Sequence, residues 1–316
     1  LTGQDCAQCN EGRECYGGWC QCPRYGNSGA LYIFRGGVGP DFDLEPDFVY
    51  WMPRTSAQPE TVRGGFDIND DGYDDIILGS FRWDGAEGND SGAVTIVTGR
   101  DAGEPGRLFA ICDTHYIYEG LNQSDLLGRS VAVLGDLNGD GCDEVAFGAP
   151  GEDAEGLNNQ GTVRVLFGWG GEACPAEPRM LRLAAAEANA QNGFSMAGGD
   201  ADGDGYDDLV VGAITRRTDN ISVGGAWVVP GSYLRSLIPR SPLQTEARAP
   251  DPIQVNGTAW LAEGVTVNAQ FGRSVAVVDG RIAVGAILDV IGGIPTVGSA
   301  RIYNVTAEGV AAEPSA

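Results

Sequence analysis

The sequence of 316 residues predicts an all-β protein built from repeated units. Forty-nine glycines separate many short runs rich in valine and isoleucine, a pattern typical of short strands joined by turns. An acidic pattern followed by such a run begins at Asp67, Asp136 and Asp200, at intervals of 69 and 64 residues. No segment has the periodicity of a long helix. We therefore expect one domain made of repeats.

Each acidic pattern has the spacing of a calcium loop. Counted from Asp200, oxygen-bearing side chains occupy positions one, three, five and nine, and Gly205 occupies position six, where the chain turns sharply. Ca²⁺ prefers six to eight oxygen ligands, which alternate side chains and one backbone carbonyl can supply. An EF-hand opens in the same way but ends at position twelve and continues as a helix, whereas here a strand follows position nine.

We therefore predict three calcium sites, each in the loop of a β-hairpin, with the residue at position seven contributing its carbonyl group. The predicted ligands are Asp67, Asn69, Asp71, Tyr73 and Asp75 in the first loop, Asp136, Asn138, Asp140, Cys142 and Glu144 in the second, and Asp200, Asp202, Asp204, Tyr206 and Asp208 in the third.

A fourth unit lacks this loop. The segment Leu127-Gly-Arg-Ser-Val-Ala-Val is nearly identical to Phe271-Gly-Arg-Ser-Val-Ala-Val, but the chain after the second copy is shorter, and Arg281 stands where the last ligand would be. Asp279-Gly280 between two apolar runs predicts a two-residue type I′ turn. We expect this hairpin to form without calcium.

The combined motifs resemble the FG-GAP repeat. Phe-Gly or Leu-Gly precedes the first strand of a unit, Gly-Ala-Pro at 148–150 ends a second strand, and a glycine opens a third strand at Gly92, Gly161, Gly224 and Gly298. The sequence is therefore similar to the β-propeller of integrin α subunits and its bacterial relatives over residues 29–305. This resemblance implies four-stranded blades around a central axis, with calcium in the loop between the first two strands of a blade.

The number of blades stays open at this point. Four units carry the repeat pattern, and Leu31–Phe34 or Phe48–Trp51 is expected to complete the last blade beside Ala300–Tyr303, as the N-terminal strand does in integrin-like rings. We expect about five blades, with seven as the alternative. The expected domains are a cysteine-rich, EGF-like segment (1–28), the FG-GAP β-propeller (29–306) and a linker or tail (307–316).

Cysteine usage indicates an oxidising compartment. Five of the eight cysteines lie in the first 22 residues, a density typical of a disulfide-rich module. Zinc is the competing interpretation of Cys6-x-x-Cys9, but no second pair follows. One of the five has to pair elsewhere or stay free, and position seven of the second loop leaves the Cys142 side chain free to cross-link. The predicted disulfide cysteines are Cys6, Cys9, Cys15, Cys20, Cys22, Cys112, Cys142 and Cys174.

Charge and composition limit the partners. The formal net charge is −24, and all 20 basic residues are arginines, which argues against nucleic acid and against anionic membrane surfaces. We expect no membrane insertion, because no apolar stretch is long enough to span a bilayer. The chain begins without methionine or a signal peptide, which favours a mature export product, secreted or on the cell surface. The absence of lysine favours a bacterial source.

No catalytic arrangement is evident, and we expect no enzyme activity. The single histidine, His115, cannot be tied by spacing to a serine or cysteine. Acidic pairs such as Glu152-Asp153 lie in a glycine-rich loop, where we expect them to be solvated. A polysaccharide-active enzyme remains an alternative, because some propellers of this repeat type belong to such enzymes.

We expect recognition on the face opposite the calcium loops. In the integrin-type arrangement, the loops between second and third strands lie on that face, and long, varied loops on a rigid scaffold commonly carry recognition. These loops span residues 80–91, 150–160, 214–223 and 287–297. The candidate ligand-binding residues are Arg82, Trp83, Arg216 and Arg217, because Arg and Trp are enriched at binding hot spots.

The alternative for these four residues is that Trp83 packs against its own blade and the arginines pair with neighbouring acids. The expected partner is an extracellular protein or glycan that binds a calcium-stabilised adhesion or recognition domain. A structural docking domain in a surface assembly is the alternative function.

Overall fold

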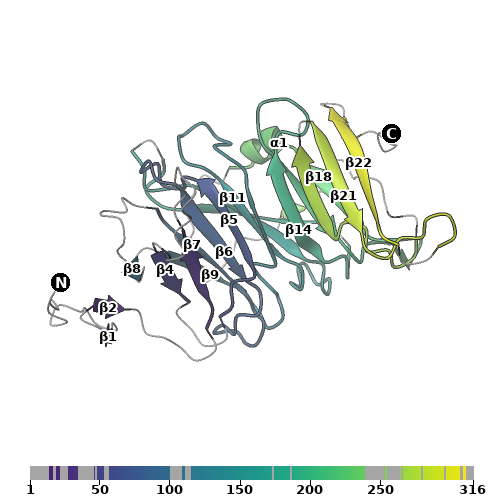
Figure 1. Ribbon diagram of the computed structural model, residues 1–316. Coiled ribbons are helices and arrows are strands. Elements are labelled where there is room, and N and C mark those ends of the chain that lie inside the picture. Colours follow the sequence, from purple (N-terminus) through teal and green to yellow (C-terminus); the bar gives the residue numbers. More distant parts are fainter. Residues whose placement is uncertain are drawn as a thin grey trace, which may run out of the picture.

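The computed structural model shows an all-β chain of sheets arranged side by side in chain order (Figure 1). It describes residues 14–16, 19–21, 28–34, 46, 48–52, 57–99, 109–110, 115–172, 174–185, 187–238, 253–254, 264, 266–278, 280–294, 297–306 and 309–310. The predicted fold class is confirmed, since the described residues contain many strands and one short helix. Among them, no helix is long and apolar enough to cross a membrane.

Four antiparallel sheets correspond to the four repeat units and are called blades 1 to 4 here. Blade 1 contains β5 (Thr61–Phe66), β6 (Asp75–Ser80), β7 (Ala93–Val97) and β9 (His115–Glu119). Blade 2 contains β10 (Ser130–Val133), β11 (Val145–Ala149), β12 (Thr162–Phe167) and β13 (Arg179–Ala184), with β19 (Ile253–Gln254) parallel to β13. Blade 3 contains β14 (Asn192–Gly199), β15 (Asp208–Ala213) and β18 (Gly225–Val229). Blade 4 contains β20 (Ser274–Val278), β21 (Arg281–Ala286), β22 (Ser299–Thr306) and β23 (Gly309–Val310).

The remaining elements are short. The strands β3 (Ala30–Ile33), β4 (Phe48–Trp51) and β8 (Phe109–Ala110) form one sheet, and β1 (Glu14–Tyr16) pairs with β2 (Trp19–Gln21). A small hairpin, β16 (Arg217–Thr218) and β17 (Ile221–Ser222), projects between β15 and β18. The helix α1 (Gly231–Ser236) follows β18.

Apolar side chains fill the spaces between neighbouring blades. The strands β7, β11, β12, β15 and β18 are buried along their whole length, because neighbouring parts of the chain cover both faces of each sheet. Phe66 and Ile77 of blade 1 pack against Val131 and Phe147 of blade 2. The same kind of core joins blade 2 to blade 3 and blade 3 to blade 4. This double burial explains why these strands read as continuous apolar runs instead of alternating ones.

The glycines of the repeat motif form the contact between successive blades. In blade 2, Ser130 on the first strand lies opposite Gly148 on the second strand. The Ser130 hydroxyl donates a hydrogen bond of 2.7 Å to the carbonyl oxygen of Gly193 in blade 3, and a Cβ at Gly148 would lie 2.2 Å from that same oxygen. Gly193 has a φ of +82°, a conformation that favours glycine.

This contact repeats at each described junction and is called the glycine seam here. Thr61 donates to Gly128 at 3.1 Å and Ser195 donates to Gly272 at 2.8 Å. The facing strand glycines are Gly79 and Gly212, where an added Cβ would lie 2.1 Å from the same oxygens. The glycine seam therefore gives the repeated Phe-Gly and Gly-Ala motifs their structural reason.

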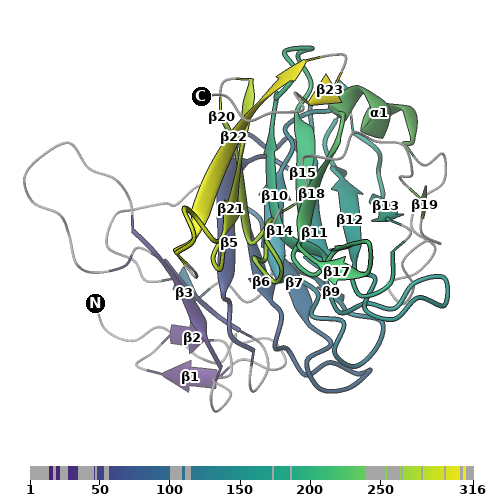
Figure 2. The same cartoon turned by 90° about the vertical axis from the view of Figure 1, so that its right-hand side faces the viewer.

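The sheets do not close into a ring by the predicted route. We expected Leu31–Phe34 or Phe48–Trp51 to pair beside Ala300–Tyr303, but β3 pairs with β4, and β22 pairs with β21 and β23. The residues Tyr50 and Met52 instead pack on the side of blade 1 away from blade 2, beside Leu78. Blade 4, with β20, β21 and β22, lies at the other end of the series (Figure 2). Ser274 of β20 is exposed there.

The tight turn predicted for the fourth unit is confirmed. Val278 pairs with Arg281, which leaves only two residues to connect β20 and β21. Gly280 has a φ of +72°, as a type I′ turn requires at this position. Asp279 itself lies outside the described residues.

Candidate metal loops and the opposite loop face

Each of the three acidic patterns lies in the loop between the first two strands of a blade. The last paired residues before these loops are Phe66 with Asp75, Val133 with Val145 and Gly199 with Asp208. All three loops therefore lie at the same end of their blades. Position six has a positive φ in each loop, with +83° at Gly72, +93° at Gly141 and +88° at Gly205. The predicted sharp turn at position six is confirmed.

The carboxylate at position one organises the loop backbone by accepting hydrogen bonds from the N–H groups that follow it. Asp67 accepts from Asn69, Asp71 and Gly72 at 3.4, 3.1 and 2.8 Å, Asp136 from Gly139, Asp140 and Gly141 at 2.6, 3.1 and 2.9 Å, and Asp200 from Gly203 and Gly205 at 2.7 and 3.1 Å. These hydrogen bonds turn the loop backbone around the carboxylate at position one.

The carboxylate at position nine is buried and joins the loop to the rest of its blade. It accepts one N–H from position two and one from a glycine just after the third strand. The distances are 2.8 and 2.6 Å for Asp75 (from Ile68 and Gly99), 2.8 and 3.2 Å for Glu144 (from Leu137 and Gly168), and 3.0 and 2.8 Å for Asp208 (from Ala201 and Gly231).

These three glycines were not among the residues predicted from the sequence. A Cβ at Gly99, Gly168 or Gly231 would lie 2.3–2.4 Å from an atom of the acidic loop that each one touches. Only glycine allows the strand end to approach the loop this closely. A glycine just after each third strand, at a similar distance from each acidic pattern, is the signal that would have found them.

Burial raises the pKa of each position-nine carboxyl group. The pKa of Asp75 and that of Asp208 rise to about 6, and the pKa of Glu144 rises to about 8. Desolvation is the main cause; the two backbone hydrogen bonds oppose it, and the neighbouring aspartates add to it. A cation in the loop would reverse this balance by favouring the ionised form.

The donor set fits a hard cation. One carboxylate oxygen from each of Asp200, Asp202 and Asp208 lies within 4.8 Å of the others. Two ligands of one Ca²⁺ ion are at most about 5 Å apart, because each lies at about 2.3–2.6 Å from the ion. In the first loop, Asn69 Oδ1 is buried and accepts no hydrogen bond from another described residue, as expected of an oxygen reserved for a metal ion.

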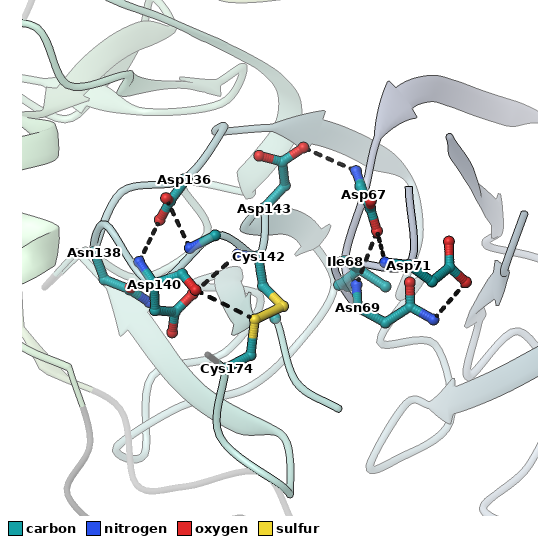
Figure 3. Close-up of a disulfide and its surroundings, with 12 residues drawn as sticks. Asp67, Ile68, Asn69, Asp71, Asp136, Asn138, Asp140, Cys142, Asp143 and Cys174 are labelled. Carbon is teal, nitrogen blue, oxygen red and sulfur yellow. Dashed lines mark hydrogen bonds between the residues drawn. A yellow bond between two sulfur atoms is a disulfide. The ribbon is translucent and has the colours of Figure 1, made fainter. Parts of the chain in front are cut away.

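A disulfide fixes the second loop. Cys142 at position seven is bonded to Cys174, 32 residues later, with their Cα atoms 6.1 Å apart (Figure 3). The sequence left several pairings of Cys142 open, and this is the one that forms. The predicted pairings of Cys6, Cys9, Cys22 and Cys112 lie outside the described residues, as do the side chains of Cys15 and Cys20.

The first and second loops also touch each other. The Asp67 N–H donates to Asp143 Oδ2 at 2.8 Å, and the Asp143 N–H donates to the Asp67 carbonyl oxygen at 2.8 Å (Figure 3). Asp67, a predicted ligand of the first loop, is therefore held by the loop of blade 2.

The predicted ligand-binding residues lie at the opposite end of the blades, and their environments differ. Trp83 is only 1% exposed and packs with Tyr50, Met52 and Leu78, so its indole cannot stack on a sugar in this structure. The expectation that Trp83 lies at the ligand surface is therefore wrong: as the alternative held, it packs in the core, between its own blade and β4.

The three arginines of that prediction are partly paired. The Arg82 side chain is 63% exposed, with its Nε 3.8 Å from Glu60. Arg216 lies 3.4 Å from Glu187, and the backbone N–H of Arg217 donates to the same carboxylate at 2.6 Å. Of the four candidates, Arg82 and Arg217 are thus the two that are exposed to a ligand.

Glu152 is buried, contrary to the expectation of a solvated acidic pair. Its carboxylate forms ion pairs with Arg182 and, at 3.5 Å, with Arg164, and it accepts a hydrogen bond from the Thr162 hydroxyl. Asp153 accepts the N–H of Asn159 at 2.7 Å and so shapes the loop after β11. Glu152 has the environment of a structural ion pair within blade 2.

Comparison with protein families matches residues 127–166 to the model described as the FG-GAP repeat. This segment covers β10, β11, β12 and the second acidic loop. Residues 127–166 are an FG-GAP repeat. The glycine seam and the acidic hairpin described above are thus the structural content of this FG-GAP repeat, and blades 1, 3 and 4 repeat parts of the same plan.

Relatives of known identity carry similar segments. The chain is 30% identical to phosphatidylinositol-glycan-specific phospholipase D of Rattus norvegicus over 167 residues, 52% of this chain and 20% of the rat protein. It is 32% identical to integrin alpha-5 of Xenopus laevis over 158 residues, 46% of this chain and 14% of that protein. It is 29% identical to integrin alpha-7 of Homo sapiens over 204 residues, 61% of this chain and 15% of that protein.

The predicted resemblance to the integrin α propeller is confirmed by these matches. The chain spans a fifth or less of the length of each of these relatives. What they share with this chain is therefore the FG-GAP repeat region.

Proposed function

We propose that the chain is a calcium-stabilised FG-GAP module that recognises an extracellular protein or glycan ligand. The observation that carries this proposal is the common design of the three acidic loops. Each has a carboxylate at position one that organises the loop, a glycine with positive φ at position six and a buried carboxylate at position nine. Three loops of one design are unlike chance clusters of surface acids.

The residues that would hold Ca²⁺ are the ones predicted from the sequence. The bound ion would supply positive charge that neutralises the loop carboxylates and joins the first two strands of a blade. The chain itself contributes the preformed turn, the buried position-nine carboxylate and, in the second loop, the disulfide at Cys142. Calcium would therefore stabilise the scaffold while the opposite loop face remains free to bind.

Action outside the cell fits two features of the chain. The disulfide between Cys142 and Cys174 is of a kind that persists in oxidising compartments. Calcium loops with several carboxylates also suit surroundings in which the ion is abundant.

We propose recognition without catalysis for this chain. One enzyme and two integrins resemble this chain. The resemblance spans at most 61% of this chain and a small share of each relative. A module shared by an enzyme and by integrins is expected to serve a purpose common to both, and binding of a ligand is the simplest one. Hydrolysis of a phosphatidylinositol glycan by the purified chain would contradict this proposal.

The calcium part is tested by isothermal titration in chelator-treated buffer. We expect Ca²⁺ to bind at the three loops, with the stoichiometry reduced by one site in Asp204→Ala. The matched control is Asp279→Ala, an aspartate in the tight turn of the fourth unit, which should leave the stoichiometry unchanged. Binding that is equal in the wild type and in Asp204→Ala would contradict the assignment of the third loop.

The recognition part is tested on an array of glycans and extracellular-matrix proteins, probed once with calcium and once with EGTA. A hit that requires calcium supports a recognition module, and its identity separates a glycan partner from a protein partner. An absence of hits with the folded chain would favour the structural docking domain instead.

A further inference from the structure

Arginine and phenylalanine side chains alternate in a row across four blades. The Arg129 guanidinium carbon lies 4.9 Å from the centre of the Phe81 ring and 4.2 Å from that of Phe194. Arg273 continues the row at 4.7 Å from the Phe194 ring, and Arg82 lies 5.4 Å from the Phe81 ring. We call these five residues the arginine row.

The glycine seam brings these side chains together. Arg129, Phe194 and Arg273 each directly follow the seam glycine of their own blade, at the start of its first strand. Phe81 and Arg82 follow β6 at the same end of blade 1. Because the seam holds neighbouring backbones in contact, the side chain after each glycine stacks on the one from the next blade. The row therefore lies at the end of the blades opposite the acidic loops.

The row concentrates positive charge in an acidic chain. The formal net charge is −24, yet three arginines from three different segments meet here. Burial lowers the pKa of Arg129, and the charges of Arg273 and Arg82 lower it further, while Glu60 opposes them. Such mutual repulsion is relieved by a bound anion.

The guanidinium groups have capacity left for a ligand. Arg129 is half-buried, and no hydrogen bond or ion pair joins its side chain to another residue within the described part of the chain. Arg273 donates one hydrogen bond of 3.4 Å to the amide oxygen of Gln270. The Arg82 side chain is mostly exposed and lies 3.8 Å from Glu60. A planar guanidinium held against an aromatic ring presents its edge donors for a bidentate contact with a carboxylate.

We propose that Arg129 and Arg273 bind carboxylate groups, presented by aspartate or glutamate side chains of a protein ligand. This inference rests on the proposed recognition function and names the chemistry of its ligand. A sugar that stacks on aromatic rings is disfavoured, because arginines cover Phe81 and Phe194 and because Trp83 is buried. A long polyanion is disfavoured by the net charge of the chain, which would repel all but a local negative group.

The test is a nuclear magnetic resonance titration of the calcium-loaded chain labelled at the arginine side chains. The probes are acetyl-Gly-Glu-Gly-amide, its glutamine counterpart and glucuronic acid. We expect the glutamate peptide to shift the Nε–H signals of Arg129 and Arg273 in a saturable manner, and added salt to weaken this binding. The glutamine peptide should leave both signals in place.

Variants then connect the signals to the row. Arg129→Gln and Arg273→Gln should each weaken binding of the glutamate peptide at least tenfold, and Arg129→Lys should weaken it less because the charge remains. The matched control is Arg235→Gln, since Arg235 also stacks on a ring, that of Tyr206, at 5.0 Å, but belongs to no row. Melting curves in calcium confirm that each variant is folded. If a variant does not fold, the titration of the wild-type chain still tests the inference.

Three results would overturn the inference. They are the absence of any shift at Arg129 and Arg273, equal binding of the glutamine peptide, and stronger binding of glucuronic acid than of the glutamate peptide. An array hit that persists unchanged in Arg129→Gln would also overturn the inference while the proposed function stands. An array without hits would instead remove the proposed function itself.

Discussion

Gly148 shows at the level of one residue why the repeat motif requires glycine. It lies in the middle of blade 2, opposite Ser130, and its α-carbon faces the backbone of Gly193 in the next blade. Its φ is not in the positive range, so the requirement comes from space and not from backbone conformation. The motif glycine is therefore a packing residue between blades.

Replacing Gly148 by alanine should therefore destabilise the chain. The added methyl group would lie 2.2 Å from the Gly193 carbonyl oxygen, and the two blades would have to separate. We expect the free energy of unfolding to fall by about 1–3 kcal/mol, as for other overpacked sites, when measured by chemical denaturation in calcium. Gly64→Ala is the matched control, because its nearest neighbour would be at 3.4 Å, an ordinary contact. Equal effects of the two substitutions would contradict the packing role.

At the level of the element, the acidic hairpin is a short strand pair whose loop is held at three points. The position-one carboxylate turns the loop, the position-nine carboxylate ties it to the end of the third strand, and in blade 2 a disulfide adds a covalent tie. Blade 4 shows that the strand pair forms with a two-residue turn as well. Strand pairing therefore does not require the long loop, as expected if that loop serves the proposed metal binding.

Removing the disulfide should weaken the second loop more than the others. Cys142→Ser combined with Cys174→Ser opens a cross-link that spans 32 residues, and the free energy of unfolding should fall by about 2–4 kcal/mol. Calcium binding at the second loop should weaken while the third loop keeps its affinity. Adding Asp204→Ala to the variant that lacks the disulfide removes the third loop from the calcium titration, so that binding at the second loop can be measured separately. An unchanged calcium affinity at the second loop would contradict a role of the disulfide in metal binding.

The buried position-nine carboxyl groups predict how stability depends on pH without calcium. Their folded-state pKa values, about 6 for Asp75 and Asp208 and about 8 for Glu144, are above those of the unfolded chain. The folded state thus favours their protonated forms, so their contribution to stability is largest at acidic pH and is lost as the pH rises through these values. In EGTA, the melting temperature should decrease between about pH 5.5 and pH 8.

Calcium should change this profile, because a bound ion favours the ionised carboxylates. The melting temperature in calcium should stay level or rise over the same pH range. Glu144→Gln provides the control, since it removes the titration at about pH 8 and should flatten the upper part of the profile in EGTA. Identical pH profiles with and without calcium would contradict the metal assignment.

At the level of the whole molecule, the chain is a series of blades joined by the glycine seam, with acidic loops at one end and the loops proposed for recognition at the other. The acidic loops of blades 1 and 2 are linked through Asp67 and Asp143, so we expect calcium bound at one proposed site to support its neighbour. The net charge of −24 adds a repulsion that bound cations would reduce.

Chelation should therefore lower the melting temperature of the whole chain. A ligand that binds only the folded state stabilises it by about 2.7 kcal/mol per site at a hundredfold excess over its dissociation constant. We expect the decrease in EGTA to be larger at low salt than at high salt, since salt screens the exposed carboxylates. Differential scanning calorimetry with and without EGTA measures this, and an unchanged melting temperature would contradict a structural role for calcium.

Features set by neighbours in sequence were predictable, and features set by the packing of blades were not. The acidic hairpins, the glycine at position six and the tight turn at Gly280 follow from local spacing, and the structure contains all three. The burial of Trp83 depends on β4, which is distant in sequence. The arginine row likewise joins residues of four blades, which are distant in sequence. The ring closure expected beside β22 also depended on distant segments, and β3 instead pairs with β4, its neighbour in sequence.

The glycine seam also bears on how such chains diversify. It consists of backbone atoms and one hydroxyl group per junction, so it does not depend on which other side chains a blade carries. Unequal recombination within the gene could therefore replace, duplicate or delete a unit without mismatching the junctions that remain. Each such event would present a new combination of loops to the ligand, and binding specificity could evolve faster than the scaffold that supports it.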